Sequence, residues 1–214
     1  MRFFVYKKNA KDSYYIQVQQ IFNRGEKKMK YFKKLVGDRI YLSPRNVEDA
    51  EIFTNWLNDF DTTDYIGHSG NLVSLEGEKE YLQKNVNEEA VFFIVTLDQD
   101  KVIGTIGIEH INHINRRGTL GVFIGDKEYR NNGYGTEAIR LVLEYGFKYL
   151  NLNNINLDLI ACNERALACY KKCGFKEAGR LRKTEFVNGK YYDRLSMDIL
   201  AEEFEGDFIR NKNL

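Results

Sequence analysis

The pattern of apolar and polar residues along the chain predicts an ordered series of strands and helices. Short apolar runs bounded by turn-forming residues predict strands over residues 39–45, 91–97, 102–111, 119–125, 154–162, 177–187 and 190–200. Apolar residues at helical spacing predict helices over 47–57, 75–87 and 136–150, and a further helix that opens at Asn163. Asn46 and Ser74 precede the first two helices and are candidate N-caps.

The connections between these elements predict how they pair. Residues 98–101 and the dipeptide Asn188–Gly189 are turn sequences, so the strands beside each should form an antiparallel hairpin. The strand over 154–162 follows a helix and should lie parallel to the strand over 119–125. The sequence therefore predicts an α+β fold, a single domain with one mixed, mostly antiparallel sheet of about seven strands and about four helices.

The longest predicted helix follows a glycine-containing loop, RNNGYG, over residues 130–135. Its polar residues recur every three or four positions and should face solvent, namely Glu137, Arg140, Glu144 and Lys148. Apolar residues fill the opposite stripe, namely Ala138, Leu141, Val142 and Tyr145. Because Gly133 and Gly135 lack a Cβ, a ligand can lie against the main chain, and the amides of such a loop favour a phosphate or pyrophosphate.

Two motifs, in this order, resemble the GCN5-related N-acetyltransferases. RNNGYG fits the acetyl-CoA loop of that family, R/Q-x-x-G-x-G/A. The family's later motif is an Asn that opens a helix, a Tyr seven residues on and then a Gly-Phe pair, and it is matched by Asn163, Tyr170, Gly174 and Phe175. The resemblance covers roughly residues 38–200 and is closest to the branch that contains ribosomal-protein N-terminal and spermidine acetyltransferases. It implies a GNAT-like acetyltransferase domain over residues 35–214.

The loop also fits a dinucleotide-binding pattern, G-x-G-x-x-G/A, through GYGTEA, with Asp158 about where the ribose-binding acid would stand. In that pattern the loop opens directly from its strand, whereas residues 126–130 separate the apolar run from the loop in this chain. The remaining chain is also too short for a second nucleotide-binding half. Acetyl-CoA is therefore expected in preference to NAD.

The resemblance implies an acetyl-CoA-dependent N-acetyltransferase that uses no metal and works by direct transfer in a ternary complex. Its acceptor would be a primary amine on a polyamine, another small amine or a protein N-terminus. Main-chain groups of the central strand would pair with the pantetheine arm and donate an amide to the thioester oxygen, as a small oxyanion hole. The implied coenzyme-binding residues are Val122, Phe123, Ile124, Arg130, Asn131, Asn132, Gly133, Tyr134, Gly135, Thr136, Asn163 and Tyr170.

Tyr170 stands where the family places its general acid, and a phenol with a pKa of about 10 can donate a proton to the departing thiolate. A tyrosine that only packs on its helix is the alternative. The base is less well defined, because close relatives often carry Glu where this chain has Thr119, which cannot act as one. Glu109 is the candidate base, with His110, His113 and a water relay as alternatives.

A catalytically silent acetyl-CoA-binding sensor or scaffold is the alternative function.

The net charge of +1 over 214 residues hides an asymmetry. Residues 1–34 hold ten basic and two acidic residues, which leaves the rest of the chain at −7. An acidic body favours a cationic acceptor, and the candidate contacts are Asp59, Asp61, Asp64, Glu109 and Asp193. Residues 1–34 are predicted to be a basic, loosely attached extension rather than an arm for nucleic acid or the ribosome.

Cysteine usage and hydropathy indicate the compartment in which the chain is expected to fold. Cys162, Cys169 and Cys173 form an odd set around one helix, which argues against a disulfide framework. No His lies near enough in sequence to complete a metal site or to activate a cysteine, so buried small side chains are expected. No apolar stretch approaches the roughly 18 residues of a membrane span, and a cytoplasmic protein is expected. The oligomeric state stays open between a monomer and a homodimer.

Overall fold

The computed structural model of the chain describes residues 29–84 and 90–211, and its main compact unit begins at Tyr31. Eight strands form one sheet in the order β1-β2-β3-β4-β5-β6-β8-β7. They are β1 (Leu35–Val36), β2 (Ile40–Pro44), β3 (Ala90–Thr96), β4 (Val102–Asn112), β5 (Arg117–Ile124), β6 (Asn154–Ile160), β7 (Lys176–Val187) and β8 (Lys190–Leu200). Neighbouring strands pair antiparallel, except for the parallel pair β5–β6.

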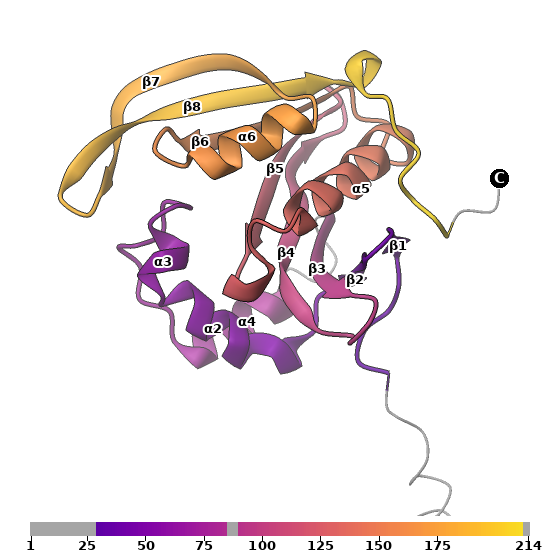
Figure 1. Ribbon diagram of the computed structural model, residues 1–214, viewed down its shortest axis with the longest axis horizontal. Coiled ribbons are helices and arrows are strands. Elements are labelled where there is room, and N and C mark those ends of the chain that lie inside the picture. The colour runs from indigo at the N-terminus through magenta and orange to yellow at the C-terminus, as the bar shows by residue number, and fades with distance from the viewer. Residues whose placement is uncertain (1–28, 85–89, 212–214) are drawn as a thin grey trace, which may run out of the picture. The chain divides into compact units, whose positions relative to one another are not determined.

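Five α-helices are found in the described residues: α2 (Ala50–Leu57), α3 (Phe60–Thr63), α4 (Leu75–Lys84), α5 (Tyr134–Lys148) and α6 (Glu164–Lys172). Figure 1 shows α2, α3 and α4 grouped together, and it shows the long β7–β8 hairpin, orange to yellow, extending past α6. No helix among the described residues is long and apolar enough to cross a membrane.

The alternation of side chains on β2 divides the core into two parts. Ile40 and Leu42 belong to a buried cluster that contains Leu141 of α5. Tyr41, between them, belongs to a second cluster that contains Phe53 of α2 and Leu82 of α4. Because successive residues of a strand point to opposite faces of the sheet, α5 covers one face and α2 with α4 covers the other.

The parallel pair β5–β6 opens at one end. Its register runs from Arg117–Asn154 to Thr119–Asn156 and stops there. β5 continues to Ile124 and stays paired with β4 along that length. The facing edges of β5 and β6 therefore part after Thr119, and this opening is where a ligand can approach the main chain of β5.

The predicted α+β fold class is confirmed. Each of the seven predicted strands appears with bounds that differ by no more than about two residues, as expected for boundaries read from sequence. The eighth strand is the two-residue β1, and the fifth helix is α3, within a segment that was expected to be irregular. Residues 1–28 of the predicted extension and the predicted end of the second helix lie outside the described residues.

The predicted N-caps are confirmed as well. Asn46 accepts a hydrogen bond from the Glu48 amide at 2.9 Å, and Ser74 accepts one from the Gly77 amide at 3.1 Å. Asp59 caps α3 in the same way, because its side chain accepts from the Asp61 amide at 3.1 Å. These short polar side chains satisfy amides that the helix itself leaves unpaired.

Glu144 of α5, predicted to face solvent, is instead fully buried. Its Oε2 accepts hydrogen bonds from the backbone amides of Phe208 at 2.5 Å and Ile209 at 3.1 Å. Its Oε1 lies 3.4 Å from the Lys148 ammonium. The segment that follows β8 crosses α5 here, so a contact 64 residues away in sequence overrides the helical pattern that predicted exposure.

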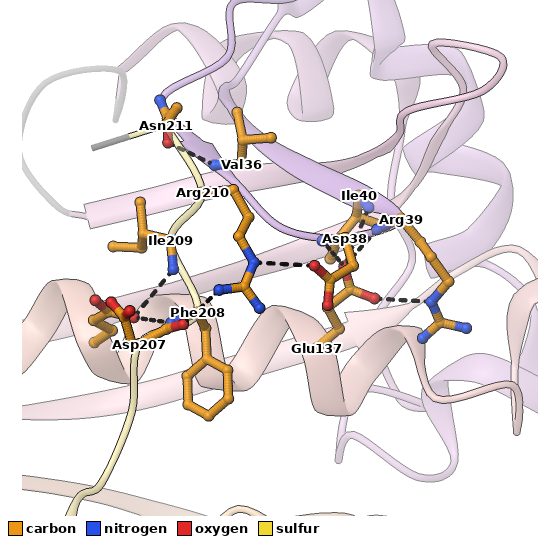
Figure 2. A network of polar contacts seen from close by, with 11 residues as sticks. Val36, Asp38, Arg39, Ile40, Glu137, Asp207, Phe208, Ile209, Arg210 and Asn211 are labelled. Carbon is orange, nitrogen blue, oxygen red and sulfur yellow. Dashed lines mark hydrogen bonds and ion pairs between the residues drawn. The ribbon is translucent and has the colours of Figure 1, made fainter. Parts of the chain in front are cut away.

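The same C-terminal segment is tied to the start of the compact unit (Figure 2). The Arg210 amide donates to the Val36 carbonyl at 2.7 Å, and its Nε pairs with Asp38 at 3.0 Å. Glu137, at the start of α5, accepts from the backbone amides of Asp38 and Arg39 at 2.8 Å each. Two carboxylates of α5 therefore hold the β1–β2 connection and the C-terminal segment.

Candidate functional site

The loop that precedes α5 exposes its main chain. Gly133 caps the helix with φ +83°, a left-handed conformation that favours glycine, and Asn131 also has a positive φ of 63°. Within the described residues, no protein group accepts a hydrogen bond from the amides of residues 131–136. Together with the positive end of the α5 dipole, these amides form a surface suited to an anion.

Arg39 holds this loop against the rest of the domain. Its Nη1 donates to the Asn132 carbonyl at 2.9 Å, and its Nε pairs with Glu137 Oε2 at 2.9 Å. Its guanidinium also lies 4.4 Å from the centre of the Tyr134 ring. Figure 2 shows Arg39 and Glu137 directed toward each other. Because Arg39 holds the loop through the Asn132 carbonyl, the amides of the loop stay available to a ligand.

The loop, β5 and α6 border a cleft of about 400 Å³. Most of the predicted coenzyme-binding residues line it, namely Val122, Phe123, Ile124, Arg130, Asn131, Gly133, Gly135, Thr136, Asn163 and Tyr170. Asn132 and Tyr134 do not line it, because Arg39 binds the carbonyl of one and lies over the ring of the other. The sequence therefore predicted the walls of this cleft, while direct contacts of all these residues with a coenzyme stay predictions.

Arg130 lines the cleft, but protein oxygens engage its guanidinium. Its Nε donates to the Ile124 carbonyl at 2.9 Å, and its Nη2 donates to the Gly125 carbonyl at 2.9 Å and to Thr62 Oγ1 at 2.7 Å. Arg130 thus ties the end of β5 to α3. Positive charge on the cleft also comes from Arg165 and Lys172, which sequence reasoning had not singled out.

Cys169 also lines the cleft, a position that sequence reasoning missed. Its Sγ lies 3.2 Å from the Thr136 hydroxyl, and hydrogen bonds from Cys173 and Thr136 lower the pKa of its thiol. The prediction of buried cysteines holds for Cys173, whereas Cys162 and Cys169 are only partly buried. All three are free thiols.

These features fit a ligand that carries a diphosphate. Free amides and two cations face the cleft, and a Cβ added at Gly135 would meet a single atom within 4 Å, Ile124 Cγ1 at 3.9 Å. A ligand can therefore lie directly against this glycine. Among the described residues, no group of three or more His, Cys, Asp or Glu is arranged to hold a metal.

A larger cavity of about 690 Å³ shares part of its wall with the cleft. The residues that line both are Tyr65, Ile66, Val122, Phe123, Asn163, Ala166 and Tyr170. Tyr170 is 8% exposed, and burial raises the pKa of its phenol, which keeps the proton on it at neutral pH. Its hydroxyl has no hydrogen-bond partner among the described residues, so a proton donor without another role lies where the two spaces meet.

Asn163 opens α6 beside this junction. Its Oδ1 accepts from the Ala166 amide at 3.1 Å, which confirms the predicted N-cap. Its Nδ2 donates to the Tyr65 carbonyl at 3.2 Å, and so fixes the segment after α3 against α6. Contact of Asn163 with a pantetheine arm stays a prediction, because the same side chain already has these two partners.

Glu109 lies in the wall of the larger cavity. It is the direct cross-strand neighbour of Thr119 in the β4–β5 register. Directly opposed residues have Cβ atoms about 4.5–5.5 Å apart on the same face of the sheet, so a carboxylate at 109 can occupy nearly the space of one at 119. His110 and His113, the other candidate bases, are exposed and line neither space.

The remaining predicted acceptor contacts lie elsewhere. Asp59 and Asp61 pair with Lys127 at 2.9 and 2.7 Å, and Asp61 lines only the smaller cleft. Asp193 pairs with Arg180 at 3.1 Å. Together with Asp64, none of these lines the larger cavity, whose carboxylates are Glu78, Glu109, Asp158 and Glu185. Sequence reasoning missed all of these except Glu109, because the four come from separate elements.

A sheet split between two parallel strands, with an amide-lined loop on one side and a second cavity on the other, is the architecture of a coenzyme A-dependent acetyltransferase domain. The chain belongs to the GNAT family: the family model described as "Acetyltransferase (GNAT) domain" matches residues 39–176. This match covers the loop, β5, α6 and most of the larger cavity, whose wall also includes Glu185 and Arg194 beyond the matched range.

Comparisons with individual proteins agree with this assignment. The spermidine N(1)-acetyltransferase of Escherichia coli K12 is 35% identical over 112 residues, which are 52% of this chain and 59% of the relative. That of Vibrio cholerae is 32% identical over 132 residues, 61% of this chain and 76% of the relative. A crystal structure of spermidine N-acetyltransferase from Vibrio cholerae with CoA and spermine is 28% identical, has a TM-score of 0.70 and covers 77% of this chain and 97% of that one. The chain thus spans about three-fifths of the length of the first of these relatives.

Proposed function

We propose that this chain transfers the acetyl group of acetyl-CoA to a primary amine by direct transfer in a ternary complex. One observation carries the proposal: unpaired loop amides border a cleft that meets a second, carboxylate-lined cavity at Tyr170. The family assignment supports acetyl-CoA as the co-substrate, which would supply an activated thioester. The solved relative with CoA and spermine supports an amine acceptor.

In this proposal each part of the site has a defined task. The amides of residues 131–136 bind the diphosphate, and the edge of β5 at residues 122–124 holds the pantetheine arm and polarises the thioester carbonyl. The amine nitrogen forms a bond to the carbonyl carbon as the carbon–sulfur bond breaks. Tyr170 gives its proton to the departing sulfur, which suits a phenol that burial keeps protonated.

The amine must lose a proton before or during this step, because an alkylamine with a pKa near 10.4 arrives mostly protonated at neutral pH. We assign that proton to Glu109, directly or through a water molecule. The support is its position across from Thr119, where the relatives that resemble this chain often carry a glutamate. The acid and the base then act from different elements, α6 and β4.

Release of free CoA with a panel of amines tests the proposal. Wild-type protein is expected to release CoA from acetyl-CoA in proportion to added polyamine, small amine or N-terminal peptide, with one acceptor preferred. Mass spectrometry of the acceptor should show one added acetyl group. Tight acetyl-CoA binding without turnover on any amine would instead support a silent sensor.

Replacing Gly135 by alanine is expected to weaken acetyl-CoA binding without harming the fold. Gly135 lies in the first turn of α5, where alanine favours the helix by roughly 0.5–1 kcal/mol, and the added Cβ would make only an ordinary contact with Ile124 Cγ1 at 3.9 Å. The methyl group would project where the coenzyme lies against the main chain. We expect the KM for acetyl-CoA to rise about tenfold, which corresponds to about 1.4 kcal/mol, with an unchanged or higher Tm.

The matched control is Gly179→Ala on β7, where an added Cβ meets no atom within 4 Å and the residue lines neither cavity. It should leave the KM for acetyl-CoA unchanged. An unaltered KM in Gly135→Ala as well would show that the coenzyme does not approach this glycine.

A homodimer and a cytoplasmic location stay predictions from the sequence.

A further inference from the structure

Glu78 of α4 is a buried carboxylate in the wall of the larger cavity. It is 4% exposed, and among the described residues neither a hydrogen bond nor an ion pair to its carboxylate is found. In the described part of the chain, every side-chain oxygen that is fully sealed from solvent has a hydrogen-bond partner, so the unpartnered Glu78 oxygens keep some solvent-accessible surface. Glu78 lines the larger cavity, which is where a ligand can reach this carboxylate. An ionised carboxylate placed this way is costly unless a ligand supplies a partner.

The fold compensates this charge only weakly. Arg45 is the cation whose field acts on Glu78 and lowers its pKa, but burial raises that pKa by more. The Arg45 guanidinium lies 5.3 Å from the centre of the Tyr81 ring. Arg45 therefore contacts the Tyr81 ring directly, whereas it acts on Glu78 only through the electric field of its charge.

Other carboxylates of the cavity have close partners of their own. Asp158 accepts a hydrogen bond from Ser196 at 2.6 Å, and Glu185 pairs with Arg194 at 2.5 Å. Glu78 differs from both in this respect. Glu78 and Glu109 both line this cavity. The cavity volume of about 690 Å³ is in the range that accommodates an extended small molecule.

We propose that Glu78 binds a second ammonium group of the acceptor, so that this chain selects amines with two or more cationic centres. This inference rests on the proposed function, since it describes the acceptor side of the same site. An ammonium supplies both the charge and the N–H donors that the Glu78 carboxylate lacks. The reacting amine would lie near Tyr170 and Glu109, and the distal ammonium would lie at Glu78.

Paired acceptors test this assignment. Straight-chain diamines from butane to octane are each compared with the straight-chain monoamine that has one more carbon, in which a methyl group replaces the distal ammonium. Wild type is expected to favour the best diamine over its monoamine by at least about tenfold in kcat/KM, a preference worth about 1.4 kcal/mol. Glu78→Gln keeps the shape and removes the charge. It should raise the KM for the diamine about tenfold and leave kcat, the KM for acetyl-CoA and all monoamine constants unchanged.

Glu76→Gln is the matched control, because Glu76 is an exposed residue of the same helix and lines neither cavity. It should resemble wild type with every acceptor. The inference would be overturned if Glu78→Gln had the same kcat and KM as wild type for both diamines and monoamines. It would also be overturned if the variant lost kcat/KM equally for both kinds of amine. Preference of wild type for amines that carry a carboxylate would also overturn it and point to Arg45.

The failure of the proposed function can be separated from the failure of this inference. If wild type turns over no amine, calorimetry in the presence of CoA measures diamine binding alone. If Glu78→Gln weakens diamine binding and Glu76→Gln does not, the cation site at Glu78 is supported and only the proposed enzymatic function is refuted. Diamine binding that is absent or independent of Glu78 would remove the site. Thermal melting of each variant confirms that it is folded.

Discussion

Replacing Tyr170 by phenylalanine is expected to lower kcat by roughly 10²- to 10⁴-fold, the usual contribution of a positioned general acid. The KM for acetyl-CoA and the Tm should change little. The hydroxyl has no hydrogen-bond partner among the described residues, and the ring, 5.8 Å from that of Phe175, stays in place. Steady-state and single-turnover CoA release measure the effect, since slow product release would hide part of it. A wild-type kcat in this variant would remove Tyr170 from the role of acid.

The pH profile separates the acid from the base. Because burial raises the pKa of Tyr170, its proton is retained as the pH rises from neutral, and Tyr170→Phe should be equally slow across that range. Glu109→Gln should instead recover with rising pH, because more of the amine then arrives already neutral. Recovery of Tyr170→Phe at high pH, or none for Glu109→Gln, would contradict this division of roles.

Local patterns were enough to predict the coenzyme side of the site. The loop over residues 130–135 and the helix opened by Asn163 are short-range motifs, so their residues and caps could be read in order along the chain. The splay of the sheet follows from one parallel pair among antiparallel neighbours, which the crossover helix between β5 and β6 predicts. Gly133 adopts the left-handed conformation for which a glycine was expected.

The acceptor side could not be predicted in this way. Its carboxylates come from α4, β4, β6 and β7, and nothing within each element distinguishes Glu78 from its exposed neighbours Glu76 and Glu80. The aspartates in and beside α3 looked better placed, yet Lys127 pairs with two of them, Asp59 and Asp61. Arg130 likewise fits the family motif in sequence, while in the fold its guanidinium binds protein oxygens. Such assignments depend on tertiary contacts, which periodicity does not encode.

Replacing Glu144 by alanine is expected to cause the largest loss of stability among the changes considered. The variant removes the acceptor for the amides of Phe208 and Ile209, and leaving a buried donor unpaired costs about 1–3 kcal/mol. Water entering the gap would recover part of this, so we expect a loss of about 2–4 kcal/mol in the free energy of unfolding. For a chain of this size that is a fall in Tm of about 5–15 °C.

Urea unfolding and thermal melting measure this loss, with Arg210→Met as the control. Arg210 makes an exposed ion pair with Asp38 in the same C-terminal segment, and such pairs contribute only about 0–1 kcal/mol. Glu144→Gln should fall between the two, because its amide carbonyl can still accept from the backbone. Since Glu144 lines neither cavity, kcat measured well below the Tm should match wild type in all three variants. A loss in Glu144→Ala no greater than in Arg210→Met would show that the C-terminal segment does not depend on this carboxylate.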